Sequence, residues 1–109
     1  MLELWQTEWC PASRRVRQRL TELGIDYLIR QVPVEKDDRD ALRAAVGTET
    51  IPALVFDNGE SAVGEGAILQ LLDAALAEPA EAGAHRRKAA KARRRYLEEE
   101  CECSQPATP

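Results

Sequence analysis

The chain has 109 residues, a net charge of −4, and a composition that is 44% hydrophobic and 31% charged. This length suits one compact domain and is too short for two. No apolar run approaches the roughly 20 residues of a membrane-spanning helix, so we expect no membrane contact. The first residues have neither the basic segment nor the apolar core of a secretory signal, and we therefore expect a cytoplasmic protein.

Charge is divided unevenly along the chain. Residues 1–79 carry 8 Lys and Arg against 14 Asp and Glu, whereas residues 80–109 carry 7 against 5. We predict a folded domain over 1–79 and a charged extension over 80–109, helical to about residue 100 and flexible beyond it. An acidic chain argues against a nucleic-acid partner. The basic run Arg86–Arg95 is interpreted first as a solvated helix face, with docking to a partner or to nucleic acid as the alternative.

The first third of the chain predicts a strand, a helix and a second strand. Leu2–Gln6 alternates apolar and polar residues, as a half-buried strand does. After a short loop, Pro11 suits the first position of a helix, and Gly24 suits the position just beyond its end. Residues 25–32 are then predicted as the second strand.

A helix, a hairpin and another helix follow. Asp37 or Asp38 can cap the helix. Residues 51–56 and 61–63 are predicted strands, and the Asn-Gly pair between them is typical of a tight hairpin turn. Residues 67–76 return to helical spacing of apolar side chains.

The element order is therefore β-α-β-α-β-β-α. A βαβ unit joins parallel strands by a right-handed crossover, and the hairpin adds antiparallel strands. The prediction is an α/β protein with a mixed four-stranded sheet and helices on its faces, followed by a basic C-terminal helical extension. Length, order and loop sizes agree with the thioredoxin fold.

Three cysteines are present, at Cys10, Cys101 and Cys103. Their odd number argues against a disulfide framework. No pair has the spacing of a structural zinc site and His85 is the sole histidine, so we expect no metal. Cys101-Glu102-Cys103 is interpreted as an incidental pair, with a resolving thiol for Cys10 as the alternative.

Cys10 lies where the first strand gives way to the first helix. The free N–H groups and positive dipole of a helix start favour a thiolate over a thiol. Arg14 and Arg15 add positive potential one turn later, whereas Glu8 opposes it. A reactive thiol is therefore predicted, and a structural cysteine inside an apolar helix is the alternative.

Three motifs carry a resemblance to a known family. Cys10-Pro11-Ala12-Ser13 resembles the C-P-x-C/S turn of glutaredoxins and of glutathione-transferase N-terminal domains, with Ser13 giving the monothiol form. Thr50-Ile51-Pro52 resembles the Thr-Val-Pro element of glutaredoxins, whose proline is cis; a trans proline that starts a strand is the alternative. Gly64-Glu65-Gly66 lies in the place of the family's glycine-containing segment before a helix. The resemblance covers residues 2–76.

The resemblance implies a glutathione site. Cys10 is then the nucleophile, with Ser13 as a hydrogen-bond donor to its thiolate. The residues expected to contact glutathione are Trp9, Pro11, Arg39, Thr50, Ile51, Pro52, Glu65 and Gly66. Arg39 lies where glutaredoxins often carry a Gln or Arg that contacts the glycyl carboxylate. A surface arginine with no part in binding is an equal alternative. Thr7 replaces a basic residue of many glutaredoxins, and Glu65 would repel the γ-glutamyl carboxylate.

These residues favour a monothiol glutaredoxin-like oxidoreductase that acts on glutathione mixed disulfides. Its partners would be glutathione, or a related low-molecular-weight thiol, as co-substrate, and protein mixed disulfides. A small glutathione-transferase-like enzyme is one alternative, although the tail is far shorter than that family's helical second domain. A non-catalytic thioredoxin-fold binding module is another. A [2Fe-2S] role is disfavoured by Pro11, because cluster-binding relatives usually have Gly at that position.

Overall fold

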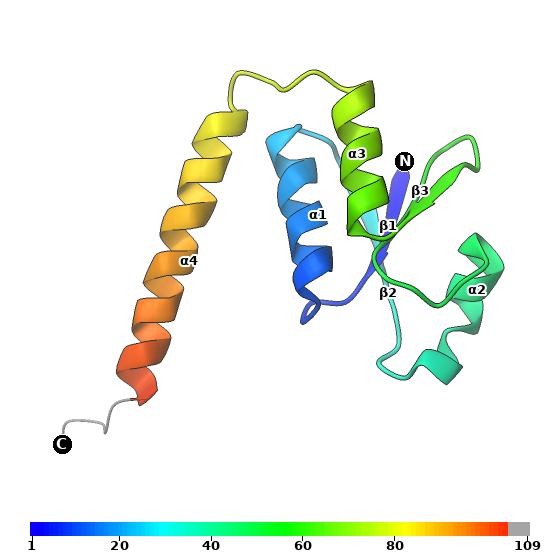
Figure 1. Ribbon diagram of the computed structural model, residues 1–109, viewed down its shortest axis with the longest axis horizontal. Helices are drawn as coiled ribbons and strands as arrows, with labels where there is room; N and C mark the ends of the chain where they lie inside the picture. The colour runs from blue at the N-terminus through cyan, green and yellow to red at the C-terminus, as the bar shows by residue number, and fades with distance from the viewer. Residues whose placement is uncertain (105–109) are drawn as a thin grey trace.

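The computed structural model describes the backbone of residues 1–104 and the side chains of residues 1–95. In chain order the elements are β1 (Leu2–Gln6), α1 (Pro11–Glu22), β2 (Tyr27–Gln31), the short 3-10 helix η1 (Lys36–Asp38), α2 (Asp40–Val46), β3 (Ala53–Val55), β4 (Ser61–Val63), α3 (Glu65–Ala75) and α4 (Ala82–Ser104). The order matches the predicted β-α-β-α-β-β-α series, followed by the helix of the extension (Figure 1).

The four strands form one mixed sheet in the order β2-β1-β3-β4. β1 pairs in parallel with β2 and antiparallel with β3, and Leu4 lies opposite Ile29 on one side and Leu54 on the other. β3 and β4 form the antiparallel hairpin. The predicted α/β architecture of the thioredoxin type is confirmed. Because β1 is central, the loop that leaves its C-terminal end is held from both sides.

The main core lies between one face of the sheet and the helices α1 and α3. Its almost fully buried members are Leu4, Val16, Leu20, Leu54, Ile68 and Leu72. Figure 1 shows α1 and α3 next to each other, with α2 apart from them, and a second cluster of Val32, Leu42 and Ala53 packs α2 against β3. Burial of each large side chain contributes about 1.5–3 kcal/mol, so the core fixes α1 and the residue that begins it.

Two helix starts differ from the prediction. The acidic cap expected at Asp37 or Asp38 is wrong, because these residues form η1 and α2 begins only after Arg39, whose φ of −90° and ψ of 42° interrupt the helix. Arg39 makes no side-chain cap bond. α3 begins at Glu65, two residues earlier than predicted, because Gly64 adopts a φ of +90° that favours glycine.

α4 packs alongside α1, on the side away from α3 (Figure 1). Ala82 at its start is buried. Arg86 on its first turns donates to Glu22 at 3.0 Å and also pairs with Glu78. Within the part of the chain that is described, no helix is long and apolar enough to cross a membrane.

Candidate functional site

Cys10 is the N-cap residue of α1. Its backbone is extended (φ −82°, ψ 117°), and Pro11 occupies the first helical turn, as predicted. The Ser13 backbone N–H donates to the Cys10 Sγ at 3.4 Å, so the sulfur takes the place that a serine or aspartate oxygen usually occupies at a helix start. The thiol therefore caps the positive end of the helix while remaining partly exposed.

The surroundings of Cys10 lower its pKa. Burial is the largest single influence and raises the pKa, but several donors act in the opposite direction and prevail. Hydrogen bonds from the Ser13 hydroxyl and from the backbone N–H groups of Ser13 and Ala12 stabilise the thiolate, and the Arg15 guanidinium adds a favourable charge. The net pKa lies below that of an ordinary cysteine, so more of the thiol is ionised at neutral pH.

The other charged residues near the thiol are already engaged. Glu8 forms an ion pair with Arg17 at 2.8 Å, and its side chain is 87% exposed, so its charge is compensated and open to solvent. Arg15, the nearby cation, pairs with Glu65. Arg14 lines a different hollow, between α1 and α4. Of the two arginines expected to add positive potential at Cys10, only Arg15 therefore acts on the thiol.

Ser13 supports the thiol from within the protein. It is fully buried, and its hydroxyl accepts a hydrogen bond from the Thr7 N–H at 3.5 Å. Thr7 is itself only 4% exposed. Thr7 does not line the hollow, so its side chain is not part of the surface that a ligand would meet. Ser13 fixes the loop between β1 and α1 and stabilises the thiolate.

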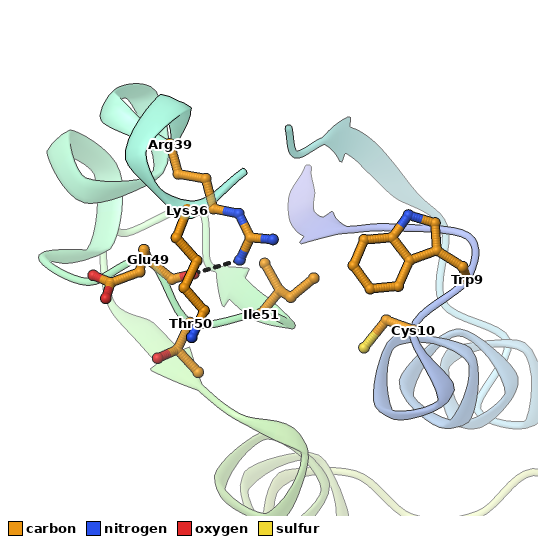
Figure 2. A pocket seen from close by; sticks show the side chains of 7 residues that line it. All are labelled: Trp9, Cys10, Lys36, Arg39, Glu49, Thr50 and Ile51. Carbon is orange, nitrogen blue, oxygen red and sulfur yellow. Dashed lines mark hydrogen bonds between the residues drawn. The ribbon is translucent and has the colours of Figure 1, made fainter. Parts of the chain in front are cut away.

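The thiol faces a hollow of about 270 Å³ (Figure 2). The residues that line it are Trp9, Cys10, Lys36, Arg39, Glu49, Thr50 and Ile51. Figure 2 shows Trp9 and Cys10 on one side and the other five across the hollow, with the sulfur directed into the space between them. Trp9 is 61% exposed and presents its indole to solvent beside the sulfur. The fold therefore brings Trp9 and Cys10 next to residues that lie more than 25 positions later in the chain.

The Ile51–Pro52 peptide bond is cis, as expected from the resemblance. Pro52 is buried, and its carbonyl accepts a hydrogen bond from the Gly64 N–H at 2.8 Å, which ties this loop to the start of α3. Within the described part of the chain, no residue forms a hydrogen bond with the backbone N–H or carbonyl of Ile51. Its N–H and carbonyl are therefore available to an extended ligand at the edge of the hollow.

Arg39 is not the surface arginine that the sequence suggested. It is only 4% exposed, and its buried guanidinium donates to three backbone carbonyls. The acceptors are Pro33 at 2.9 Å, Val34 at 3.0 Å and Glu49 at 2.8 Å. Arg39 lines the hollow, yet all three of its nitrogens already hold the loops on either side of α2 together.

Glu65 is paired with Arg15 through both carboxylate oxygens, one of them at 2.8 Å. The hydrogen bond from Arg15 lowers the pKa of the Glu65 carboxyl, which is therefore ionised and charge-compensated. The repulsion expected between Glu65 and a ligand carboxylate is reduced accordingly. Gly66 is exposed in the first turn of α3, where backbone N–H groups lack intrahelical partners.

Sequence reasoning missed Lys36 and Glu49. Lys36 is exposed in η1 and lines the hollow opposite the thiol, where it supplies a positive charge. Nothing in the sequence distinguishes it from an ordinary surface lysine, and only the fold brings it near Cys10. Among the residues with described side chains, no group of three or more His, Cys, Asp or Glu could hold a metal ion. The Cys101 and Cys103 side chains lie outside the described residues.

Residues 4–80 match the family model for the N-terminal domain of glutathione S-transferase. Solved structures with the same fold include a glutathione transferase family member from Pseudomonas fluorescens with bound glutathione, at 27% identity and a TM-score of 0.65. Glutathione S-transferases from Rhodospirillum rubrum (26% identity, TM-score 0.61) and Sinorhizobium meliloti (27%, 0.62) are also similar.

The aligned region is most of this chain but a minor part of these relatives. It covers 72% of this chain and 40% of the Pseudomonas protein, 73% and 38% for the Rhodospirillum protein, and 68% and 32% for the Sinorhizobium protein. A search of curated proteins gives no match. The similarity therefore concerns the domain that contains Cys10.

Proposed function

The chain belongs to the family of glutathione S-transferase N-terminal domains, and we propose that it binds glutathione and uses Cys10 for thiol–disulfide exchange with glutathione mixed disulfides. The observation that carries the proposal is the state of Cys10, a partly exposed thiol of lowered pKa that faces a hollow. A thiolate is the nucleophile that such exchange requires.

Glutathione is proposed to lie in this hollow with its cysteinyl part beside the Ile51 backbone. The free N–H and carbonyl of Ile51 suit an extended peptide, which pairs with them as an added strand would. Lys36 offers a positive charge to one ligand carboxylate, and the α3 N-terminus at Gly66 offers N–H groups to the other. Trp9 lines the hollow beside the thiol.

The reaction proceeds in two balanced exchanges. The Cys10 thiolate attacks the glutathionyl sulfur of a mixed disulfide, so a Cys10–glutathione disulfide forms while the other thiol leaves as its thiolate. The thiolate of a second glutathione then attacks the glutathionyl sulfur of that adduct, which releases oxidised glutathione and restores the Cys10 thiolate. Ser13 and Arg15 keep Cys10 ionised for the first exchange and favour its departure as a thiolate in the second, because they stabilise its negative charge.

Protein mixed disulfides are proposed as substrates alongside small ones, because Cys10 and Trp9 lie at the surface. A cytoplasmic location would supply the reduced glutathione that the second exchange consumes. A related low-molecular-weight thiol could replace glutathione without changing either step.

Conjugation of glutathione to an electrophile is the second candidate, favoured by the similarity to solved glutathione transferases. In that reaction Cys10 would stabilise the glutathione thiolate by a hydrogen bond and form no covalent bond to it. A non-catalytic module that only binds through this face is the third.

One set of assays separates the three. We expect the wild-type protein to reduce the mixed disulfide of glutathione and a small thiol in the presence of reduced glutathione, and Cys10→Ser to abolish this turnover. Conjugation of glutathione to a halogenated aromatic without such turnover would favour the transferase. Glutathione binding with neither activity would leave the binding module.

A further inference from the structure

A second hollow, of about 430 Å³, lies between α1 and α4, the two helices that run alongside each other in Figure 1. Its polar lining includes Arg14, Arg17, Thr21, Tyr27, His85 and Arg93. None of its lining residues is acidic, and none is shared with the hollow at Cys10. Three guanidinium groups, a phenol and an imidazole therefore surround one space.

The positive charge of this α1–α4 hollow is only partly compensated. Arg17 pairs with Glu8 and also donates to the Gln6 side chain. Arg93 donates to the neutral side-chain oxygen of Gln18 at 3.3 Å, across the space between the helices. No carboxylate of the described residues pairs with Arg14 or Arg93. Guanidinium groups held around one hollow repel each other unless an anion lies between them.

The wall that α4 contributes is held in place by its own contacts. Arg86, two turns before Arg93, donates to the Glu22 carboxylate, which is only 5% exposed. Burial raises the pKa of Glu22, but hydrogen bonds from Gln18 and Arg19 and the charge of Arg86 lower it further than burial raises it. The buried carboxylate is therefore ionised and fixes α4 against α1.

We propose that the α1–α4 hollow binds a small phosphate-bearing anion. Guanidinium groups hold phosphate oxygens through paired N–H bonds, and Arg14 and Arg93 approach from different helices. The Tyr27 hydroxyl lies in the same lining and can donate another hydrogen bond. The volume of the α1–α4 hollow, about 430 Å³, falls within the range of small-ligand sites.

A carboxylate ligand fits this lining less well. It has two oxygens and one negative charge, whereas a phosphate monoester presents three terminal oxygens and about two charges, and a diphosphate presents more of both.

A long nucleic acid is disfavoured by charge. Residues 1–79 carry 14 acidic against 8 basic residues and would repel an extended polyanion that continues beyond the basic faces of α1 and α4. Lys88 and Lys91 on α4 are exposed but do not line the hollow. They provide a matched control, because nucleic acid would use them together with the lining arginines, whereas a small anion inside the hollow would not.

The test is isothermal titration of the full chain with inorganic pyrophosphate and with adenosine diphosphate at constant ionic strength. We expect saturable binding of both at one site. Arg14→Gln/Arg93→Gln should weaken it by at least roughly tenfold for each guanidinium removed. Lys88→Gln/Lys91→Gln, which removes the same charge from exposed positions that do not line the hollow, should change the affinity by less than about threefold. Melting temperatures of both variants establish that they fold.

Three results would overturn the proposal. The first is no saturable binding of either probe to the wild-type chain. The second is an equal loss of affinity in the two double variants, which would reduce the effect to overall charge. The third is tighter binding of a DNA or RNA duplex than of either probe, with the loss shared by the Lys88→Gln/Lys91→Gln variant. Each of these three binding results is independent of the activity of Cys10. The proposed exchange reaction and the proposed anion site can therefore be refuted separately.

Discussion

Arg39→Met provides the most direct test of how the site is held together. The guanidinium is 4% exposed and donates to three carbonyls at 2.8–3.0 Å. Methionine preserves much of the stem but leaves these acceptors without their donor. A hydrogen bond from a charged group contributes about 1.5–3 kcal/mol, and the three are not additive because relaxation and water will satisfy some of the acceptors. We therefore expect a loss of about 3 kcal/mol of unfolding free energy.

A loss of this size lowers the melting temperature of a domain of about 100 residues by roughly 12–24 °C. It should be measured by circular dichroism during thermal and urea unfolding. Arg43→Met is the matched control on the same helix, because Arg43 is 36% exposed and its contacts with Asp40, with Glu49 and with the Lys36 carbonyl all lie at the surface. Such pairs contribute about 0–1 kcal/mol, so Arg43→Met should lie within about 1 kcal/mol of wild type.

Equal stabilities of Arg39→Met and Arg43→Met would refute the structural role of Arg39. If Arg39→Met also kept wild-type stability but lost glutathione binding, Arg39 would be a ligand-contacting residue instead.

Three further predictions concern the thiol and the docking of α4. Ser13→Ala should raise the pKa of Cys10, because the thiolate loses a hydroxyl donor, and the change is measured by the thiolate absorbance against pH. Arg15→Gln should also raise it, by less, and slow alkylation of Cys10 by iodoacetamide at neutral pH. Glu22→Gln should cost roughly 2 kcal/mol and speed amide hydrogen exchange in α4, because the buried anion that binds Arg86 is lost. Since the folded pKa of Glu22 lies below its ordinary 4.5, its contribution is complete above about pH 4.5 and disappears as the pH falls through the folded value.

The controls for these three are surface residues of the same type. Ser61→Ala, on the exposed start of β4, should leave the pKa of Cys10 unchanged, and Arg30→Gln, which breaks a surface pair with Glu3, should leave the alkylation rate unchanged. Asp73→Asn, whose side chain is 55% exposed in its pair with Arg19, should cost less than about 1 kcal/mol. A control that moves as far as its test variant contradicts the corresponding prediction.

Local patterns in the sequence predict the parts of the fold that local physics governs. Pro11 marks a helix start and Gly24 its end because each restricts or permits particular backbone conformations, whatever lies far away in the chain. The position of Cys10 follows from the same boundary. The cis bond at Pro52 was predicted from the resemblance alone, since nothing in the neighbouring residues requires it.

The features that sequence reasoning missed depend on tertiary contacts that local patterns do not specify. Glu65 and Arg15 are 50 residues apart, so their pairing cannot be predicted without the packing of α1 against α3. Arg39 was expected either to contact glutathione or to lie at the surface, yet the fold turns its guanidinium inward to three carbonyls. The helix expected to begin at Asp37 is interrupted for a related reason, because Arg39 takes a non-helical conformation between η1 and α2.

The proposed exchange depends on a covalent intermediate at Cys10, and mapping that adduct is its most direct test. The Cys101→Ser/Cys103→Ser protein, which keeps Cys10 as its sole cysteine, should be incubated with oxidised glutathione and examined by peptide mass spectrometry. We predict one glutathionyl group on the peptide that contains Cys10, removed by reduced glutathione. An unmodified Cys10 peptide, or an adduct that reduced glutathione does not release, would contradict the account.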